Sequence, residues 1–469
     1  MNLSNQELTT YLKNFFPDQY NAFINARPEK TAIRLNTLKI DAPTFRKYLD
    51  QWQVKYSSHP VNPYGMIIEE DFLPLSHTLS FFKGEFNYQG IASQIPVLAL
   101  NPQPGETILD MTASPGSKST QIAALMQNKG RLVLNEVSTR RQQALVTNTL
   151  RNGVINDVTL CMPGQRIGVL FYEFFDRVLV DAPCSALGTL SKNSYDLNKW
   201  WSAQAMEKLT KVQHHLLVSA IKALKVNGII VYSTCSITPE ENEKVIDQLI
   251  KNYPIRVEEI YFADNPIFHQ GLTQYEGVNF HKDLSKTLRT FPHTSGMEGF
   301  FIAKLRKTEP VKINTTRSPM KFTPAGTPDN PEIAPVLEHL SRRWGIDYRY
   351  LQQFHYIINQ KRLWMFTSDW HEIPSDAMVK AGLVLAEKRF REWKLSNASV
   401  QFLKNKITRS KLELDQNQLS ALFREGELEL PGHPPAYYVL TYEDEPIASV
   451  SFFNGKLKIR LPHFFKLIM

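Results

Sequence analysis

The sequence contains little cysteine and no long apolar segment. Only three of its 469 residues are cysteines, and they show neither a disulfide-type spacing nor a paired cysteine and histidine spacing for zinc. These absences exclude a disulfide-stabilised secreted scaffold and a zinc module. No stretch approaches the roughly 18 apolar residues of a membrane span, and the first residues lack the pattern of a signal peptide. We therefore expect a soluble, cytoplasmic protein without a metal site.

Nucleotide-binding glycine motifs are also missing. The segment 110–118, DMTASPGSK, has Ser117 where a P-loop has a glycine, and it lacks the G-x-G-x-x-G spacing of dinucleotide-binding folds. It is rich in small residues and opens into a predicted helix, so backbone amides and the helix N-terminus can approach a ligand closely. Glu136 ends the next predicted strand, where a carboxylate can accept hydrogen bonds from ribose hydroxyls. Together these features indicate a nucleoside-containing cofactor, although Glu136 taken singly is typical of a solvated strand end.

The charge balance is mildly basic. Lys and Arg number 54 against 46 Asp and Glu, which gives a net charge of +8 and a pI near 9.1. An anionic partner such as nucleic acid is compatible with this balance, which is also common in proteins without such a partner.

Short apolar runs alternate with amphipathic stretches through the middle of the chain. Strands are predicted at 106–111, 131–136, 157–162, 177–183 and 228–235, and helices at 118–126, 139–151, 203–224 and 239–251. This rhythm predicts a doubly wound α/β sheet, with a late strand at 299–307 after a loop-rich segment at 265–293. We expect an N-terminal α+β domain at 1–90, the α/β domain at 91–307, a linker at 308–331 and a C-terminal module at 332–469.

Two of the three cysteines stand at the ends of predicted strands: Cys184 directly follows one, and Cys235 is the last residue of another. Cys184 lies in VLVDAPCSALG and Cys235 in GIIVYSTCSI. The last residues of buried parallel strands reach the crevice in which open α/β sheets bind ligands, so both thiols are expected at one sheet edge. A single cysteine there would more often be a packing residue. The pair predicts covalent chemistry on a substrate at the mouth of the sheet.

Five ordered segments resemble the Nop/Sun family of RNA cytosine-5 methyltransferases. They are DMTASPGSKSTQIA, NEVSTRR, VDAPCSALG, VYSTCSITPEENE and RTFPHTSGMEGFFIAKL, and the earlier pieces IRLNTLK and GEFNYQGIASQIP match as well. Within the family the chain is most similar to the bacterial RsmF-type ribosomal RNA enzymes. The resemblance implies a Rossmann-like core that uses S-adenosylmethionine, an N-terminal α+β domain of RNA-binding type, and a C-terminal accessory domain for which a PUA-like fold is one candidate.

The resemblance also implies roles for individual residues. Cys235 matches the nucleophile that adds to C6 of cytosine, and Cys184 matches the cysteine implicated in removing the C5 proton and releasing the product. Asp181 matches the acid that hydrogen-bonds the ring near N3, and Lys118 matches a lysine that contacts the target nucleotide. The positions that match the cofactor site are Ser114, Pro115, Gly116, Ser117, Lys118, Glu136, Arg141 and Asp181.

The implied partner is RNA, most simply small-subunit ribosomal RNA or the assembled subunit, and the protein is expected to act as a monomer. Weaker family matches have a second interpretation as residues with internal hydrogen bonds or solvated side chains. They are Arg34, Asn36, Gln89, Lys192 and the stretch 289–293.

Several positions depart from the family pattern, chiefly in the cofactor site. Thr112, Ser114 and Ser117 replace the commoner Cys, Ala and Gly, and Ala186 replaces a glycine. Gly164 stands where the family usually has an aspartate that binds the adenine amino group. Loss of one such hydrogen bond costs about 0.5–1.5 kcal/mol, so we expect weakened rather than absent cofactor binding.

Two other functions stay open at this point. The departures favour a catalytically silent RNA-binding or ribosome-assembly factor, whereas the intact Asp181, Cys184, Cys235 and Lys118 oppose it. A DNA cytosine-5 methyltransferase would carry its nucleophile in a Pro-Cys-Gln turn, but Ser185 follows Cys184 here.

The C-terminal module interleaves basic and aromatic residues. This pattern suits RNA, because cations contact phosphates and aromatic rings stack on bases, but it is also typical of an amphipathic helix with an aromatic core face. The residues are Arg342, Arg343, Trp344, Lys388, Arg389, Phe390, Arg391, Trp393, Lys394, Lys404, Lys406, Arg409 and Lys411.

Overall fold

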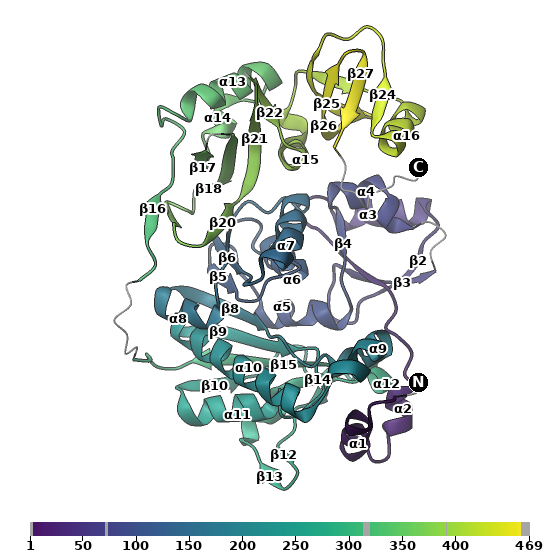
Figure 1. Cartoon of the computed structure of the whole chain (residues 1–469), viewed down its shortest axis with the longest axis vertical. Coiled ribbons are helices and arrows are strands. Elements are labelled where there is room, and N and C mark those ends of the chain that lie inside the picture. The colour runs from purple at the N-terminus through teal and green to yellow at the C-terminus, as the bar shows by residue number, and fades with distance from the viewer. Residues whose placement is uncertain (1–2, 71–73, 313–318, 360, 391, 461–469) are drawn as a thin grey trace.

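One mixed sheet runs through the centre of the molecule (Figure 1). The computed structural model describes residues 3–70, 74–312, 319–359, 361–390 and 392–460. In this part of the chain the sheet has the order β11-β14-β15-β9-β8-β5-β6-β7-β20, and β10 pairs with β15. The strands are β5 (Thr107–Asp110), β6 (Arg131–Asn135), β7 (Asp157–Leu160), β8 (Phe175–Asp181), β9 (Leu224–Thr234), β10 (Ile255–Glu258), β11 (His269–Gln270), β14 (Leu288–Thr290), β15 (Phe300–Lys307) and β20 (Met378–Ala381).

The five central strands, β5 to β9, run parallel, and β15 pairs antiparallel with β9. Helices cover both faces, which explains why these strands are almost continuously apolar. Val178 and Val180 of β8 belong to one hydrophobic core, and Leu179 between them belongs to the other. The α/β class predicted from the alternation is therefore confirmed.

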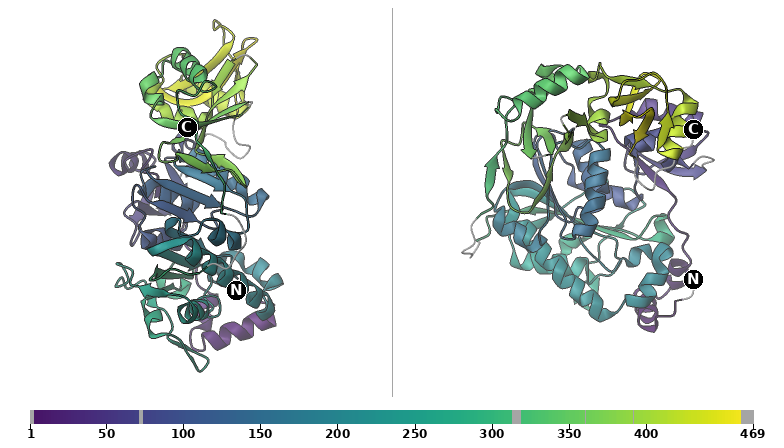
Figure 2. Two further views of the ribbon diagram at one scale, coloured as in Figure 1. Left: turned by 90° about the vertical axis from the view of Figure 1, so that its left-hand side faces the viewer. Right: turned by 45° about the horizontal axis from the view of Figure 1, so that its top comes forward.

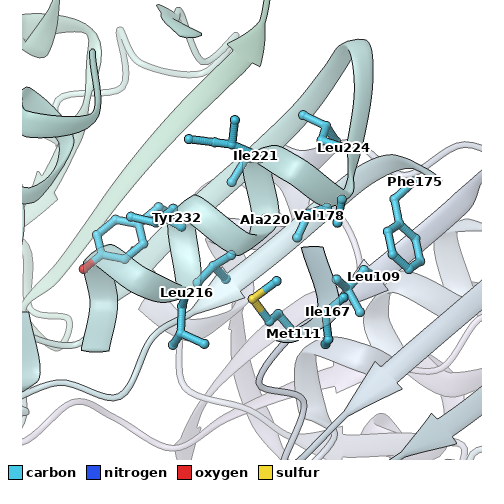
Figure 3. Close-up of a cluster of buried hydrophobic side chains, with 14 of the residues drawn as sticks. Leu109, Met111, Ile167, Phe175, Val178, Leu216, Ala220, Ile221, Leu224 and Tyr232 are labelled. Atoms are coloured by element: carbon cyan, nitrogen blue, oxygen red, sulfur yellow. The ribbon is translucent and has the colours of Figure 1, made fainter. Parts of the chain in front are cut away.

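The helices divide between these two cores. The first core contains α8 (Ile167–Leu170), α10 (Ala203–Ala223) and α11 (Glu243–Asn252); Figure 3 shows Leu216, Ala220 and Ile221 of α10 lying over Val178. The second core contains α5 (Ile95–Leu100), α6 (Ser117–Leu125) and α7 (Thr139–Arg151). Side chains from α10 and from the ends of β5 and β8 therefore meet near the carboxyl edge of the sheet.

Two parts of the core differ from the sequence expectation. The helix predicted at 239–251 begins at Glu243, because residues 239–242 form a turn whose Glu241 and Asn242 side chains are buried and hydrogen-bonded. The segment 265–293, expected to be loop-rich, contributes β11 and β14 to the sheet edge. Buried Arg289 in β14 pairs with buried Glu243, an interaction that apolar periodicity does not reveal.

The N-terminal region has its own antiparallel sheet of order β2-β3-β1-β4 in the described residues. Its elements are β1 (Ala32–Leu35), α3 (Ala42–Gln51), β2 (Lys55–Ser58), β3 (Gly65–Glu70), α4 (Leu79–Lys83) and β4 (Phe86–Tyr88). Two earlier helices, α1 (Gln6–Phe15) and α2 (Tyr20–Ile24), instead pack into a core with Leu187 and Trp201 of the central region. Trp201 follows α9 (Leu190–Trp200).

The C-terminal region contains two further sheets, which lie at one end of the molecule (Figure 2). The first consists of β17 (Phe354–Asn359), β18 (Arg362–Thr367), β21 (Leu383–Arg389) and β22 (Glu392–Leu395). The second consists of β23 (Lys411–Glu413), β24 (Glu427–Glu429), β25 (Ala436–Tyr442), β26 (Glu445–Phe453) and β27 (Lys456–Ile459). The accompanying helices are α13 (Ala334–Trp344), α14 (Tyr348–Leu351), α15 (Asn397–Leu403) and α16 (Gln416–Glu425).

One strand joins the C-terminal region to the central sheet. β20 pairs antiparallel with β7, and its Lys380 Nζ lies 2.8 and 2.6 Å from the two carboxylate oxygens of Asp157. Within the expected linker, β16 (Phe322–Pro324) pairs with β19 (Glu372–Pro374), and residues 313–318 of that linker lie outside the described residues. The division of the chain into four units stays a prediction.

No helix in the described part of the chain has the length and apolar character that a membrane span needs. The same residues contain no cluster of three or more His, Cys, Asp or Glu side chains that could hold a metal ion.

Candidate active site

A cavity of about 420 Å³ opens at the carboxyl edge of the central sheet. The segments that follow β5, β6, β7, β8 and β9 all contribute to its lining, because parallel strands end at the same sheet edge. Six of the predicted catalytic and cofactor-binding residues line it: Ser114, Glu136, Arg141, Asp181, Cys184 and Cys235.

The two cysteines meet in this cavity. Cys184 Sγ lies 3.3 Å from Cys235 Sγ, and both side chains are partly exposed. Their turns are also joined through the main chain, since the Gly188 N–H donates to the Cys235 carbonyl oxygen at 2.9 Å. The hydrogen bond with Cys235, followed by burial, raises the pKa of Cys184 well above its ordinary value. The two thiols therefore lie together at one edge of the sheet, as the sequence predicted.

Asp181 and Lys118 form an ion pair beside the thiols. Lys118 Nζ lies 2.7 Å from Asp181 Oδ2 and donates to Ser93 Oγ at 3.1 Å, while the Ser233 hydroxyl donates to Asp181 Oδ1 at 2.7 Å. Burial by itself would lower the pKa of Lys118, but the charge and hydrogen bond of Asp181 outweigh it and raise that pKa. The hydrogen-bonded carboxylate of Asp181 therefore lies at the cavity wall, with the Lys118 ammonium held behind it.

The turn that contains Ser114, Pro115, Gly116 and Ser117 is held from α7. The Arg141 guanidinium donates to the Ser114 carbonyl oxygen at 2.9 Å, and the Ser114 hydroxyl donates to the Arg141 carbonyl oxygen at 2.9 Å. Gly116 has a φ of 105°, a conformation that favours glycine, immediately before α6 begins at Ser117. Arg141 thus braces the turn through both its side chain and its backbone.

Glu136 lies directly after β6 and is almost completely buried. Its Oε1 accepts a hydrogen bond from the Ser138 N–H at 2.9 Å, and its Oε2 lies 3.6 Å from Arg141. This orientation leaves a carboxylate on the cavity wall, with lone pairs that suit the hydroxyls of a ribose. The residues present therefore fit the ribose of S-adenosylmethionine.

Gly164 also lines the cavity, but it cannot supply the acid expected from the family pattern. Its carbonyl oxygen accepts a hydrogen bond from Ser219 at 2.7 Å, and a Cβ at this position would lie 2.6 Å from Leu216 Cδ2. Figure 3 shows Leu216 and Met111 in this part of the core. Apolar packing occupies the space that a larger residue at position 164 would need.

The weaker family matches make internal contacts. Arg34 is buried and donates to Gln89 and Thr120 at 2.7 and 2.9 Å, and Asn36 donates to the Gly84 carbonyl oxygen at 2.8 Å. Lys192 pairs with Glu298 at 2.7 Å.

Three residues beneath the thiols were not predicted: Ser185, Ser236 and Glu241. All are fully buried and hydrogen-bonded to one another. The available signal was the repeated Cys-Ser pair, which occurs once after each of the two strands.

The sheet, its carboxyl-edge cavity and the glycine turn define the chain as an α/β protein with a site for a nucleoside-containing cofactor. Comparison with known sequences gives the family: residues 97–306 match the family described as "16S rRNA methyltransferase RsmB/F". The chain is 31% identical over 453 residues to Ribosomal RNA small subunit methyltransferase F of Shigella boydii, covering 93% of this chain and 90% of the relative. The Erwinia tasmaniensis protein of the same name is 29% identical over 462 residues, covering 95% and 92%.

The protein therefore belongs to the RsmB/F family of ribosomal RNA cytosine-5 methyltransferases, which use S-adenosylmethionine. Solved structures agree. A methyltransferase homolog protein from Pyrococcus horikoshii superposes with a TM-score of 0.59 at 29% identity, covering 65% of this chain and 96% of that one. NSun6 from Pyrococcus horikoshii with SFG gives a TM-score of 0.56 at 25% identity, covering 65% and 98%. The resemblance seen in the sequence is confirmed, as are the enzyme class and the cofactor.

Proposed function

We propose that this enzyme methylates C5 of a cytosine in 16S ribosomal RNA through a covalent bond between Cys235 and C6. The observation that carries the proposal is the 3.3 Å separation of the Cys184 and Cys235 sulfurs, at a cavity also lined by Asp181, which is paired with Lys118. The target must be brought to this sheet edge, because the nucleophile lies at the end of a buried strand.

Cys235 opens the reaction as a thiolate, after its proton has passed to solvent. Its sulfur forms a bond to C6, and the C5=C6 electron pair shifts toward C5. The neighbouring pair of Asp181 and Lys118 holds a proton at N3 during this attack and takes it back on release. S-adenosylmethionine, when bound, supplies the electrophilic methyl group that C5 accepts. Glu136 and the turn around Ser114 would hold that cofactor.

Cys184 loses its own proton to solvent and then completes the reaction as a thiolate that accepts the C5 proton. The electrons of the C5–H bond then restore C5=C6, and the C6–sulfur bond pair returns to Cys235 as a thiolate. The hydrogen bond with Cys235 is the largest cause of the raised pKa of Cys184. Once Cys235 is bonded to carbon this interaction is lost, so the pKa of Cys184 falls at the stage when a base is needed.

The test is to incubate the protein with S-adenosylmethionine and three substrates: naked 16S ribosomal RNA, assembled small subunits, and DNA. Mass spectrometry of the digested nucleosides should detect 5-methylcytosine in RNA but not in DNA, and Cys235→Ala should abolish it. Methylation of DNA would instead favour the DNA-enzyme alternative.

One observation favours a second candidate, a silent RNA-binding or ribosome-assembly factor: Gly164 offers no carboxylate to adenine, and Leu216 occupies the neighbouring space. Calorimetry of S-adenosylmethionine separates the two. An affinity up to roughly tenfold weaker than that of family members with the adenine-binding aspartate supports the enzyme. No binding at millimolar cofactor supports the silent factor.

We further propose that the C-terminal region contacts RNA through the turn between β21 and β22. Phe390 is 97% exposed there, so its ring is available for stacking on a base. Its φ of 53° is a conformation that bulky residues rarely adopt. Burial, followed by the charge of Arg460, lowers the pKa of neighbouring Lys394 to about 8. Trp344, by contrast, is buried in the core, and Arg391 lies outside the described residues.

Phe390→Ala should weaken RNA binding by about 1–3 kcal/mol, the value of one base–aromatic stack, while S-adenosylmethionine binding stays unchanged. The matched control is Tyr261→Ala, which removes a 71% exposed ring from the central region. Equal effects of the two substitutions would refute this contact.

The proposed organisation keeps the expected units at 1–90, 91–307, 308–331 and 332–469, with a PUA-like C-terminal fold and a monomeric, cytoplasmic protein.

A further inference from the structure

Each active-site cysteine is followed by a serine, and both serines bind one buried carboxylate. The Ser185 and Ser236 hydroxyls donate to Glu241 Oε2 at 2.5 and 2.6 Å, and the Ser185 backbone N–H donates to Glu241 Oε1 at 2.8 Å. The exposed fraction of all three residues is 0%. One carboxylate therefore spans the two turns that carry the thiols.

Two further donors complete the shell of Glu241. Thr238 Oγ1 donates to Oε2 at 2.9 Å, and Gln213 Nε2 donates to Oε1 at 3.0 Å and to the Pro183 carbonyl oxygen at 2.9 Å. No Lys, Arg or His in the described ranges forms an ion pair with Glu241. Five neutral donors compensate the buried charge, and two of them come from Ser185.

We infer that Glu241 is a positioning residue that holds the Cys184 loop against the Cys235 turn and so sets the separation of the two sulfurs. This inference rests on the covalent mechanism proposed above. In that mechanism Cys235 is bonded to C6 while the proton to be removed is on the adjacent C5. The acceptor at Cys184 must therefore stay within a few ångströms of Cys235, as the 3.3 Å separation provides.

The two turns do not depend equally on this carboxylate. Cys235 directly follows β9, whose last residues, Ser233 and Thr234, are paired with the neighbouring strands. Cys184 lies three residues beyond the end of β8, just before Ala186, which has a φ of 59°. Loss of Glu241 should therefore displace Cys184 more than Cys235. Addition to C6 should proceed while release is slowed, which general destabilisation of the fold would not produce.

The experiment uses the full chain with 16S ribosomal RNA and S-adenosylmethionine in single turnovers, and follows the covalent RNA–protein band on denaturing gels. Glu241→Ala should form the band at close to the wild-type rate and lose it roughly ten- to a hundredfold more slowly. Ser185→Ala, which removes one donor without adding bulk, should show a smaller slowing in the same step. Glu240→Gln is the matched control, because that adjacent carboxylate binds the Tyr11 hydroxyl instead.

Release at the wild-type rate in both Glu241→Ala and Ser185→Ala would overturn the inference. Equal slowing of formation and release, with S-adenosylmethionine binding preserved, would overturn it as well, because it would indicate only a general structural role. If Glu241→Ala does not fold, Ser185→Ala decides. Cys184→Ala serves as the mechanistic reference: if it accumulates no band, the covalent mechanism has failed, independently of Glu241.

Discussion

Two buried carboxylates near opposite sides of the sheet are bound by different kinds of donor. Asp157, in β7, is bound by the ammonium of Lys380, which also donates to the Gly382 carbonyl oxygen at 2.9 Å. Glu241, beneath the thiols, is bound by hydroxyl and amide donors that carry no net charge. An ion pair cancels the charge and joins two regions of the chain, whereas neutral donors leave a fixed negative charge and join two loops.

The contact at Asp157 is structural, whereas the contacts at Glu241 support the active site. At Asp157 the partner lysine comes from β20, so the pair locks the C-terminal region onto the catalytic sheet. At Glu241 a cation would place a second positive charge near the thiols, in addition to that of Lys118. Neutral donors fix the geometry of the turns without adding a second positive group beside the cysteines.

The largest expected effect comes from breaking the ion pair. Lys380→Ala leaves Asp157 buried without its cation and should lower the free energy of unfolding by about 3–5 kcal/mol, measured by chemical denaturation. Methylation per folded molecule should stay near wild type, because Lys380 does not line the cavity. The control is the double variant Lys380→Met/Asp157→Leu, which removes both charges and should recover much of the loss. A double variant as unstable as the single one would contradict this account.

Asp110 sharpens the comparison, because it has fewer donors than either carboxylate. The Ser119 hydroxyl donates to its Oδ2 at 2.7 Å, and its Oδ1 has no hydrogen-bond partner among the described residues. Burial raises the pKa of Asp110 to about 7. The folded state then retains a proton that the unfolded chain has lost, so this carboxyl makes stability fall as pH rises from about 4 to 7.

Asp110→Asn should remove that dependence. The variant should gain stability relative to the wild type across the same interval, by at most about 4 kcal/mol. Unfolding free energies measured at pH 5 and pH 8 test this. A constant difference between the two proteins would show that Asp110 titrates normally.

The smallest effect is expected at an exposed pair. Glu207 lies 2.8 Å from Lys211 one turn along α10, and both side chains are about two-thirds exposed. Glu207→Gln should leave the free energy of unfolding unchanged within the error of chemical denaturation, because water and salt screen such pairs. A loss of unfolding free energy comparable to that of Lys380→Ala would show that burial does not determine how much such ion pairs contribute to stability.

The sequence predicted those parts of the site that follow from local patterns of apolar residues. The strands before Cys184 and Cys235 were predicted because buried parallel strands are continuously apolar, and their shared edge followed from strand direction. Glu241 was missed because it lies in a turn predicted as helix, and its partners are up to 56 residues away in sequence. The β7–β20 pairing was also missed, since a short strand from a distant region leaves no periodic signal of its own.

The most direct test of the account is to react Cys184→Ala with 16S ribosomal RNA and S-adenosylmethionine and analyse the products on a denaturing gel. The account predicts a slowly migrating band that ribonuclease removes and that is absent from the Cys184→Ala/Cys235→Ala double variant. A folded, cofactor-binding Cys184→Ala protein that gives no such band, or a band that persists without Cys235, would contradict the proposed roles of the two thiols.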